Sequence, residues 1–207
     1  MSADTNPLSS TKDIAEQLLE QGNKTSDFNA ALNLYQQALD IYEKAQDQAG
    51  IASAYNNLGI TYTRLNKKEL ALDFLHKALN LWKEICDREN EAIAQLNIGW
   101  VYENVDEILN ALEFYQKALT TQEEIGEQKD IADTLQIIGA VYERQARKLY
   151  RQAIATYKEI GDKKAIRYLI KNTKIRDLIA PTDSDLSDVT EGTDPGEPPK
   201  IYPPVTK

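Results

Sequence analysis

Residues that could carry catalytic or metal chemistry are scarce in this chain. His76 is the only histidine and Cys86 the only cysteine among 207 residues. A transition-metal site needs several histidine or cysteine ligands, and a catalytic triad needs a nucleophile with an oriented base. The sequence also lacks a glycine-rich loop between a strand and a helix that could hold a phosphate. We therefore predict that the protein is not an enzyme and carries no metal or cofactor.

Carboxamide side chains offer chemistry of another kind. Asn57 and Asn97 lie 40 residues apart, and each comes two residues before a glycine. A carboxamide both donates and accepts hydrogen bonds, so it can pair with a peptide unit whatever side chain that unit carries. The next 40-residue step reaches Ile137, which limits such a series to two members. Hydrogen bonding between neighbouring helices is the alternative role for these asparagines.

Trp100 is the second candidate for recognition. The positions 40 residues before and after it hold Ile60 and Ala140. Tryptophan is a frequent anchor of protein interfaces. We therefore expect Trp100 to contribute to binding, and packing between helices is the alternative.

These candidates recur because the sequence itself repeats. Two short patterns occur three times each at a step of 40 residues: Ala31–Leu39, Ala71–Leu79 and Ala111–Leu119, and Leu58–Tyr62, Ile98–Tyr102 and Ile138–Tyr142. A fixed period of this length predicts an architecture of stacked repeats. Apolar residues at helical spacing predict two helices in each repeat. The predicted helices cover residues 13–21, 27–46, 51–65, 68–86, 91–105 and 108–125.

Glycine recurs at one position of the repeat, as Gly59, Gly99 and Gly139. Glycine inside a helix costs about 1 kcal/mol relative to alanine, so its recurrence needs a packing reason. Helix axes approach closely only where the facing side chain is small. We therefore predict that these glycines allow close contact between paired helices.

The fourth repeat departs from the pattern. Tyr150 follows Tyr115 at a step of 35 residues, so five residues are missing between Tyr142 and Tyr150. Residues 143–148 contain no glycine, proline or asparagine, and they are strong helix formers. We predict one continuous helix over about residues 129–160, with a hairpin that turns near Gln145 as the alternative.

A continuous helix cannot fold back on itself. The apolar residues of its second half would then need a partner elsewhere: Leu149, Ile154 and Tyr157. A second copy of the chain could supply that partner by exchanging the helix, which is a common route to a dimer.

The repeated residues resemble a known family. Tyr55, Leu58, Gly59 and Tyr62, followed by Ala71, Leu75 and Ala78, resemble the tetratricopeptide repeat. The resemblance covers about residues 12–165, and the 40-residue step is similar to the branch seen in kinesin light chains and in many bacterial regulatory and scaffold proteins. It implies an all-α, right-handed superhelical solenoid of antiparallel helix pairs.

The predicted organisation has three parts. Residues 1–11 form a flexible N-terminus, and residues 12–180 form three regular repeats, a shortened fourth repeat and a capping helix over 163–179. Residues 181–207 hold six of the seven prolines and six acidic residues, a composition that predicts a disordered tail.

The resemblance also implies a binding face. In this family the first helix of each pair lines a concave surface, and Asn57 and Asn97 are similar to the asparagine ladder that holds an extended peptide in kinesin light chain-like repeats. The candidate peptide-binding residues are Asn56, Asn57, Ile60, Arg64, Asn97, Trp100, Glu103, Asn104, Gln136, Ala140 and Arg144. Because Glu103 and Glu143 oppose the arginines of this face, we do not expect the carboxylate clamp of chaperone-binding repeats.

Charge and hydropathy limit the partners. The formal net charge of -9 argues against binding to nucleic acid, which requires clusters of basic residues. No stretch approaches the roughly 20 apolar residues of a membrane span, and the first ten residues do not resemble a secretory signal. We expect a cytoplasmic protein that binds neither nucleic acid nor a membrane.

The leading hypothesis is a non-enzymatic scaffold or adaptor that binds an extended peptide segment of another protein. Two alternatives stay open. The first is a structural homodimer with exchanged helices, whose groove is filled by its own tail or by the partner chain. The second is a peptide-sensing bacterial regulator.

Overall fold

The computed structural model describes residues 7–172, whose regular secondary structure is entirely helical. The helices in this part of the chain are α1 (Pro7–Lys24), α2 (Phe28–Ala45), α3 (Gln48–Arg64), α4 (Lys68–Glu84), α5 (Arg88–Asn104), α6 (Ile108–Ile125), α7 (Gln128–Glu159) and α8 (Lys163–Asn172). Two compact units meet inside α7, one ending at Ile138 and the other beginning at Gly139.

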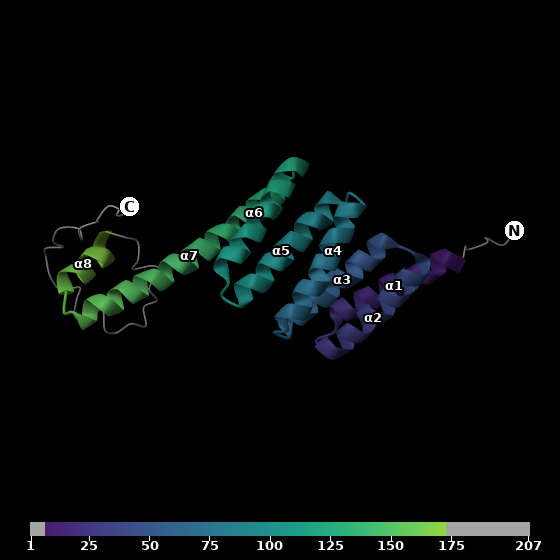
Figure 1. Cartoon of the computed structure of the whole chain (residues 1–207), viewed down its shortest axis with the longest axis horizontal. Coiled ribbons are helices and arrows are strands. Elements are labelled where there is room, and N and C mark those ends of the chain that lie inside the picture. The colour runs from purple at the N-terminus through teal and green to yellow at the C-terminus, as the bar shows by residue number, and fades with distance from the viewer. Residues whose placement is uncertain (1–6, 173–207) are drawn as a thin grey trace, which may run out of the picture. The chain divides into compact units, whose positions relative to one another are not determined.

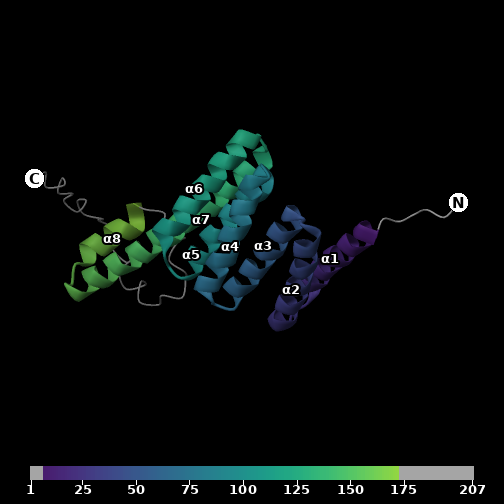
Figure 2. The same ribbon diagram turned by 45° about the vertical axis from the view of Figure 1, so that its right-hand side comes forward.

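Helices α1 to α6 of the first unit form three pairs, α1 with α2, α3 with α4 and α5 with α6. The pairs stack through contacts of α2 with α3 and of α4 with α5, and Figures 1 and 2 show successive helices side by side. Leu75, Ile98 and Val101 lie fully buried between the pairs. The predicted all-α solenoid of helix pairs is therefore confirmed.

The helices of the first unit end at regular intervals. Left-handed backbone recurs every 20 residues, at Gln46, Asn66, Cys86, Asp106 and Gly126, with φ of 55°, 55°, 58°, 59° and 90°. At the first four, the amide of the next residue donates to the carbonyl five residues back, as Lys67 does to Tyr62 at 2.9 Å. This is the hydrogen bond of a Schellman turn, which ends a helix and satisfies its last carbonyls.

The next 20-residue step falls on Ala146, and no turn forms there. Alanine disfavours left-handed backbone and is the strongest helix former, so α7 continues for 32 residues as one ribbon in Figure 1. The predicted continuous helix over about residues 129–160 is confirmed, and the alternative of a hairpin near Gln145 is wrong.

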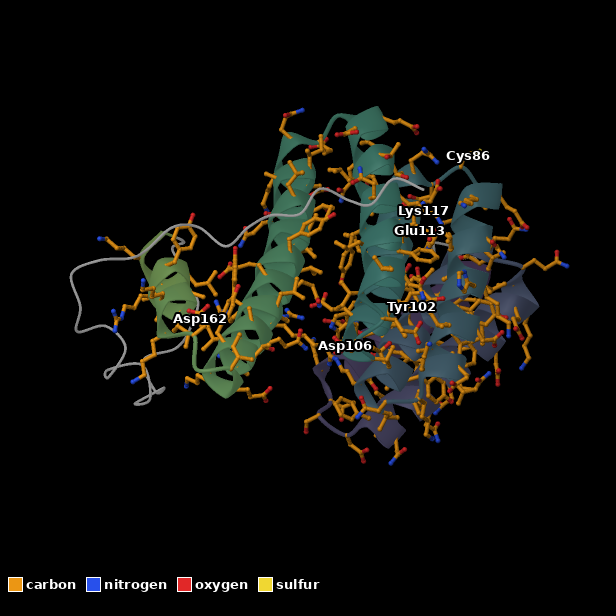
Figure 3. The ribbon with its side chains drawn as sticks, turned by 60° about the vertical axis from the view of Figure 1, so that its left-hand side comes forward. Cys86, Tyr102, Asp106, Glu113, Lys117 and Asp162 are labelled. Carbon is orange, nitrogen blue, oxygen red and sulfur yellow. The ribbon has the colours of Figure 1, made fainter. Side chains whose placement is uncertain are left out.

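Aspartates begin several of the helices. Asp27 Oδ1 accepts hydrogen bonds from the amides of Asn29 and Ala30, at 2.9 and 3.3 Å. Asp47 and Asp87 act in the same way at α3 and α5, each through one backbone amide. In the second unit, Asp162, labelled in Figure 3, accepts from the amide of Ala165 at 3.0 Å where α8 begins. Such caps satisfy amides that have no partner within the helix.

The recurring glycine allows close helix packing in two of its three copies. A Cβ at Gly59 would lie 2.5 Å from Leu75 Cγ, and one at Gly99 would lie 2.5 Å from Tyr115 Cε1. A Cβ at Gly139 would meet nothing within 4 Å. The packing prediction is therefore confirmed at Gly59 and Gly99 and wrong at Gly139, because the residues that should fold back over Gly139 continue along α7.

The first helix differs from its prediction at both ends. It begins at Pro7, before the expected start at residue 13 and inside the segment expected to be flexible. Proline suits the first helical position, where its missing amide hydrogen would have no partner in any case. Gly22 does not stop the helix but lies buried in it, because an added Cβ there would be 2.3 Å from Tyr35 Cε1.

In the second unit, α8 covers part of α7. Ile154 and Ile166 are 6% and 2% exposed, and Tyr157 packs against them. Ile154 and Tyr157 therefore have the partner that they need in α8 of the same chain, whereas Leu149 stays 63% exposed. The predicted capping helix over 163–179 is described as far as Asn172; its remainder and the predicted tail over 181–207 lie outside the described residues.

The glycine contacts predict opposite effects for one substitution at two equivalent positions. In Gly59→Ala the new methyl group would lie 2.5 Å from Leu75 Cγ and 3.2 Å from the carbonyl oxygen of Ala71. Overpacking of this kind costs about 1–3 kcal/mol and outweighs the gain in helix propensity. We expect the free energy of unfolding, measured by urea titration, to fall by about 1–2 kcal/mol.

Gly139→Ala is the matched control, because its methyl group meets no neighbour within 4 Å. In the isolated chain only the helix propensity changes, and at protein concentrations that keep the chain monomeric we expect a gain of up to about 1 kcal/mol. Equal changes in the free energy of unfolding at the two positions would contradict this assignment of the contacts.

Candidate functional site

Three of the predicted binding residues line one hollow in the first unit. The hollow has a volume of about 240 Å³ and lies where α3 faces α1 and α2. Asn57, Ile60 and Arg64 of α3 contribute to its wall. The other lining residues are Gly22, Asn23, Thr25, Phe28, Ala31, Tyr35 and Thr61.

Polar groups of this hollow differ in how far they are satisfied. Tyr35 Oη donates to Asn23 Oδ1 at 2.7 Å, and burial raises the pKa of Tyr35, an effect that the positive charge of Arg64 partly offsets. The backbone carbonyl of Asn57 accepts from Thr61 Oγ1 at 2.8 Å. The half-buried carboxamide of Asn57, in contrast, makes no hydrogen bond to any other residue that the structure describes. It is therefore available to a ligand.

The second predicted asparagine has a partner inside the protein. Asn97 Nδ2 on α5 donates to Asn56 Oδ1 on α3 at 2.9 Å. This bond joins the first helices of two consecutive pairs. Such a bond between helices is the role that the sequence analysis gave as the alternative to peptide binding. It uses one donor of Asn97 and one acceptor of Asn56, and a role for either in peptide binding stays a prediction.

The remaining candidates on α5 also make internal contacts. Asn104 Nδ2 donates to the backbone carbonyl of Trp100 at 3.0 Å, and Tyr115 Oη donates to Glu103 Oε2 at 2.6 Å. The indole of Trp100 is half-buried rather than fully exposed.

Three candidates lie on α7. Gln136, Ala140 and Arg144 are all exposed, and Ala140 and Arg144 belong to the unit that begins at Gly139. None of the three lines the hollow around Asn57. The structure thus brings three of the candidates, Asn57, Ile60 and Arg64, to one hollow, and a role of any candidate in binding stays a prediction.

The sequence analysis did not predict a second, larger hollow in the first unit. It measures about 580 Å³ and is lined by Lys83, Arg88, Glu91, Gln95, Glu113, Gln116, Lys117, Thr120 and Thr121. Figure 3 labels Glu113 and Lys117 on α6, where they form an ion pair at 2.6 Å. One signal in the sequence marks this region: Glu91 takes the position that isoleucine holds at residues 51 and 131.

Glu91 is only 3% exposed, yet its charge is compensated. Arg88 pairs with Glu91 and with Glu124, so it links the start of α5 to the end of α6. Gln95 Nε2 donates to Glu91 Oε1 at 3.2 Å and Thr121 Oγ1 donates to Gln95 Oε1 at 3.1 Å. Pairing and hydrogen bonding of this kind offset the cost of burying the charge, so the loss of one partner would leave a buried charge uncompensated.

Other classes of site are absent from the described part of the chain. Residues 7–172 contain no group of histidine, cysteine, aspartate or glutamate residues that could hold a metal ion. None of the described helices is both long enough and apolar enough to span a membrane.

Three helix pairs of similar length, stacked through contacts of α2 with α3 and of α4 with α5, define this molecule as an α-helical repeat protein. The family model of the tetratricopeptide repeat matches residues 14–84 and 50–119, which together make up just over half of the chain. The chain belongs to the tetratricopeptide repeat family. Membership supports a role as a scaffold of protein–protein interaction, and it supports the prediction that the protein is not an enzyme.

Two solved structures are similar to this chain. BtubC (BKLC) from P. vanneervenii is 16% identical, with a TM-score of 0.50 over 98% of this chain and 82% of that chain, and it shares the fold. The N-terminal domain of stress-induced protein-1 (STI-1) from C. elegans is 19% identical, with a TM-score of 0.45 over 66% of this chain and 98% of that chain. No curated protein matches the sequence.

The half-buried side chain of His76 on α4 predicts that the stability of the protein depends on pH. Burial lowers the pKa of His76, and the charges of Lys117 and Lys83 lower it further. The unfolded chain therefore takes up this proton at a higher pH than the folded chain, and the free energy of unfolding should fall as the pH drops below about 6.5. Glutamine holds the equivalent positions, residues 36 and 116, so His76→Gln should remove this contribution.

Urea titrations of the wild type and of His76→Gln at about pH 7.5 and about pH 5.5 measure how the free energy of unfolding changes with pH. Histidine is the side chain that ordinarily titrates in this range. The wild type should lose more stability than His76→Gln between the two values. An equal loss in both proteins would contradict the prediction.

Proposed function

We propose that the protein is a scaffold that binds an extended peptide segment of another protein, and that recognition centres on the hollow lined by Asn57, Ile60 and Arg64. One observation carries the proposal: the carboxamide of Asn57 has no hydrogen-bond partner among the described residues, although it is half-buried at the wall of a hollow. A polar group in such a position gains a partner when a ligand binds.

Each of the three side chains suits a different part of a peptide. Asn57 can donate to a peptide carbonyl and accept from a peptide amide, and each such bond contributes about 0.5–1.5 kcal/mol. Ile60 offers apolar surface to a side chain of the ligand. Arg64 is exposed and can pair with a carboxylate, which favours a peptide with an acidic residue next to an apolar one.

The size of the hollow favours a peptide over a small molecule. Its volume of about 240 Å³ lies below the roughly 300–1,000 Å³ of small-molecule sites. A peptide needs only to insert one side chain there while its backbone extends along the inner helices. In this proposal the peptide continues along α5, where Trp100 is half-buried. Asn97 bonds to Asn56 through Nδ2, so its Oδ1 atom takes no part in that bond.

No step requires Gln136, Ala140 or Arg144, which line no part of the hollow. A cytoplasmic location belongs to the proposal as well, and the single cysteine suits a reducing compartment.

Binding to an array of short peptides of random sequence tests the proposal. We expect the wild-type protein to select peptides that carry an acidic residue beside an apolar one. Arg64→Glu should abolish this selection because it reverses the charge at the hollow, and Asn57→Ala should weaken binding by about threefold to tenfold, the equivalent of one hydrogen bond.

Lys44→Glu is the matched control. Lys44 is exposed in the last turn of α2 and lies outside the hollow, so this variant changes the net charge as Arg64→Glu does. It should bind like the wild type. Selection that survives Arg64→Glu, or that is lost equally in Lys44→Glu, would refute the assigned site.

A further inference from the structure

The face of α7 around Gly139 is open where the equivalent faces of α3 and α5 are covered. Leu75 lies against Gly59 and Tyr115 lies against Gly99, but no atom lies within 4 Å of a Cβ added at Gly139. Tyr142 on the same helix is 60% exposed and Leu149 is 63% exposed. Two large, exposed apolar side chains thus lie on the same helix as a glycine that no other residue covers. All three residues belong to the second unit.

These residues form a single stripe with a seven-residue period. Gly139, Ala146 and Ala153 follow one another at steps of seven residues, and Tyr142 and Leu149 alternate with them. Steps of three and four residues keep side chains on one face of a helix and form the seam along which two helices pair in a coiled coil. Val141, which is 2% exposed, lies on another side of the helix.

The order of small and large residues fits an antiparallel partner of the same sequence. When a second α7 runs in the opposite direction with the two-fold axis near residue 144, residue 139 faces residue 149 and residue 142 faces residue 146 of the other copy. Each large side chain then meets a small one: Leu149 meets Gly139, and Tyr142 meets Ala146. The first unit already contains this kind of contact at Gly59 and Leu75 and at Gly99 and Tyr115.

The charges of α7 favour the same direction. Residues 128–143 carry one basic and three acidic side chains, whereas residues 144–159 carry five basic and one acidic. An antiparallel pair brings the acidic half of each helix alongside the basic half of the other, with most of these side chains on the side of the helix away from the seam. Side-chain size therefore selects the antiparallel arrangement, and the charges of the two halves are compatible with it.

We propose that the protein forms a homodimer in which the two α7 helices pair as an antiparallel coiled coil along Gly139, Tyr142, Ala146, Leu149 and Ala153. Each copy supplies the other with the helix that the missing turn removed from its own fourth repeat. The seam is separate from the hollow around Asn57, so dimerisation and peptide binding can be tested apart.

Sedimentation equilibrium of the full chain tests the dimer. We expect the wild type to sediment at twice its mass of 23.4 kDa. Leu149→Glu should raise the dissociation constant of the dimer at least about tenfold, since it places a charge in the seam. Ala155→Glu, an equally acidic change at an exposed residue on the opposite side of α7, should leave the dimer intact. Circular dichroism is used to check that each variant keeps its helices.

An exchange of sizes tests the register. Gly139→Leu alone should dissociate the dimer because two leucines then meet, although the isolated chain has open space for the new side chain. Adding Leu149→Ala to that variant restores one large and one small residue in each contact and should restore the dimer. The proposal is overturned by a monomeric wild type, by an unchanged dissociation constant in Leu149→Glu, by a dimer that survives Gly139→Leu, by dissociation in Ala155→Glu, or by a double variant that stays monomeric.

Discussion

The contact between a large side chain of one helix and a glycine of its partner organises the repeats of this protein. Leu75 against Gly59 and Tyr115 against Gly99 bring the paired helices together at distances that admit no further methyl group. Close approach requires that the second helix of each pair fold back along the first. A turn must therefore separate them, and the whole architecture depends on where turns form.

Turns with left-handed backbone form at 20-residue steps from Gln46 to Gly126, and the series ends at Ala146, within a run of strong helix formers. The loss of one turn has two consequences within the same helix. It removes the partner of Gly139. It also places the residues that correspond to the second helix of a pair at the far end of α7, where they cannot fold back on the first half of the same helix. The fourth repeat is therefore a single long helix with an open seam instead of a closed helix pair. The hollow around Asn57 belongs to the regular repeats.

Periodicity made much of this fold predictable, because a 40-residue step reports the stacking unit directly. The absence of turn residues before Tyr150 likewise sufficed for the continuous helix. Individual contacts between helices were harder to predict, because the repeat period does not specify which side chains meet in space. The bond from Asn97 to Asn56, the cover that α8 provides for Ile154, and the pairing of buried Glu91 all belong to that class.

The length of α7 is the most direct test of this account. Spin labels at Lys129→Cys and Lys158→Cys, with Cys86→Asn to remove the native thiol, would report the distance across the helix when labelled protein is diluted into unlabelled protein. A continuous helix separates the two Cα atoms by about 44 Å. A helical hairpin would bring them within about 10–20 Å, and such a distance would contradict the lost turn on which the open seam depends.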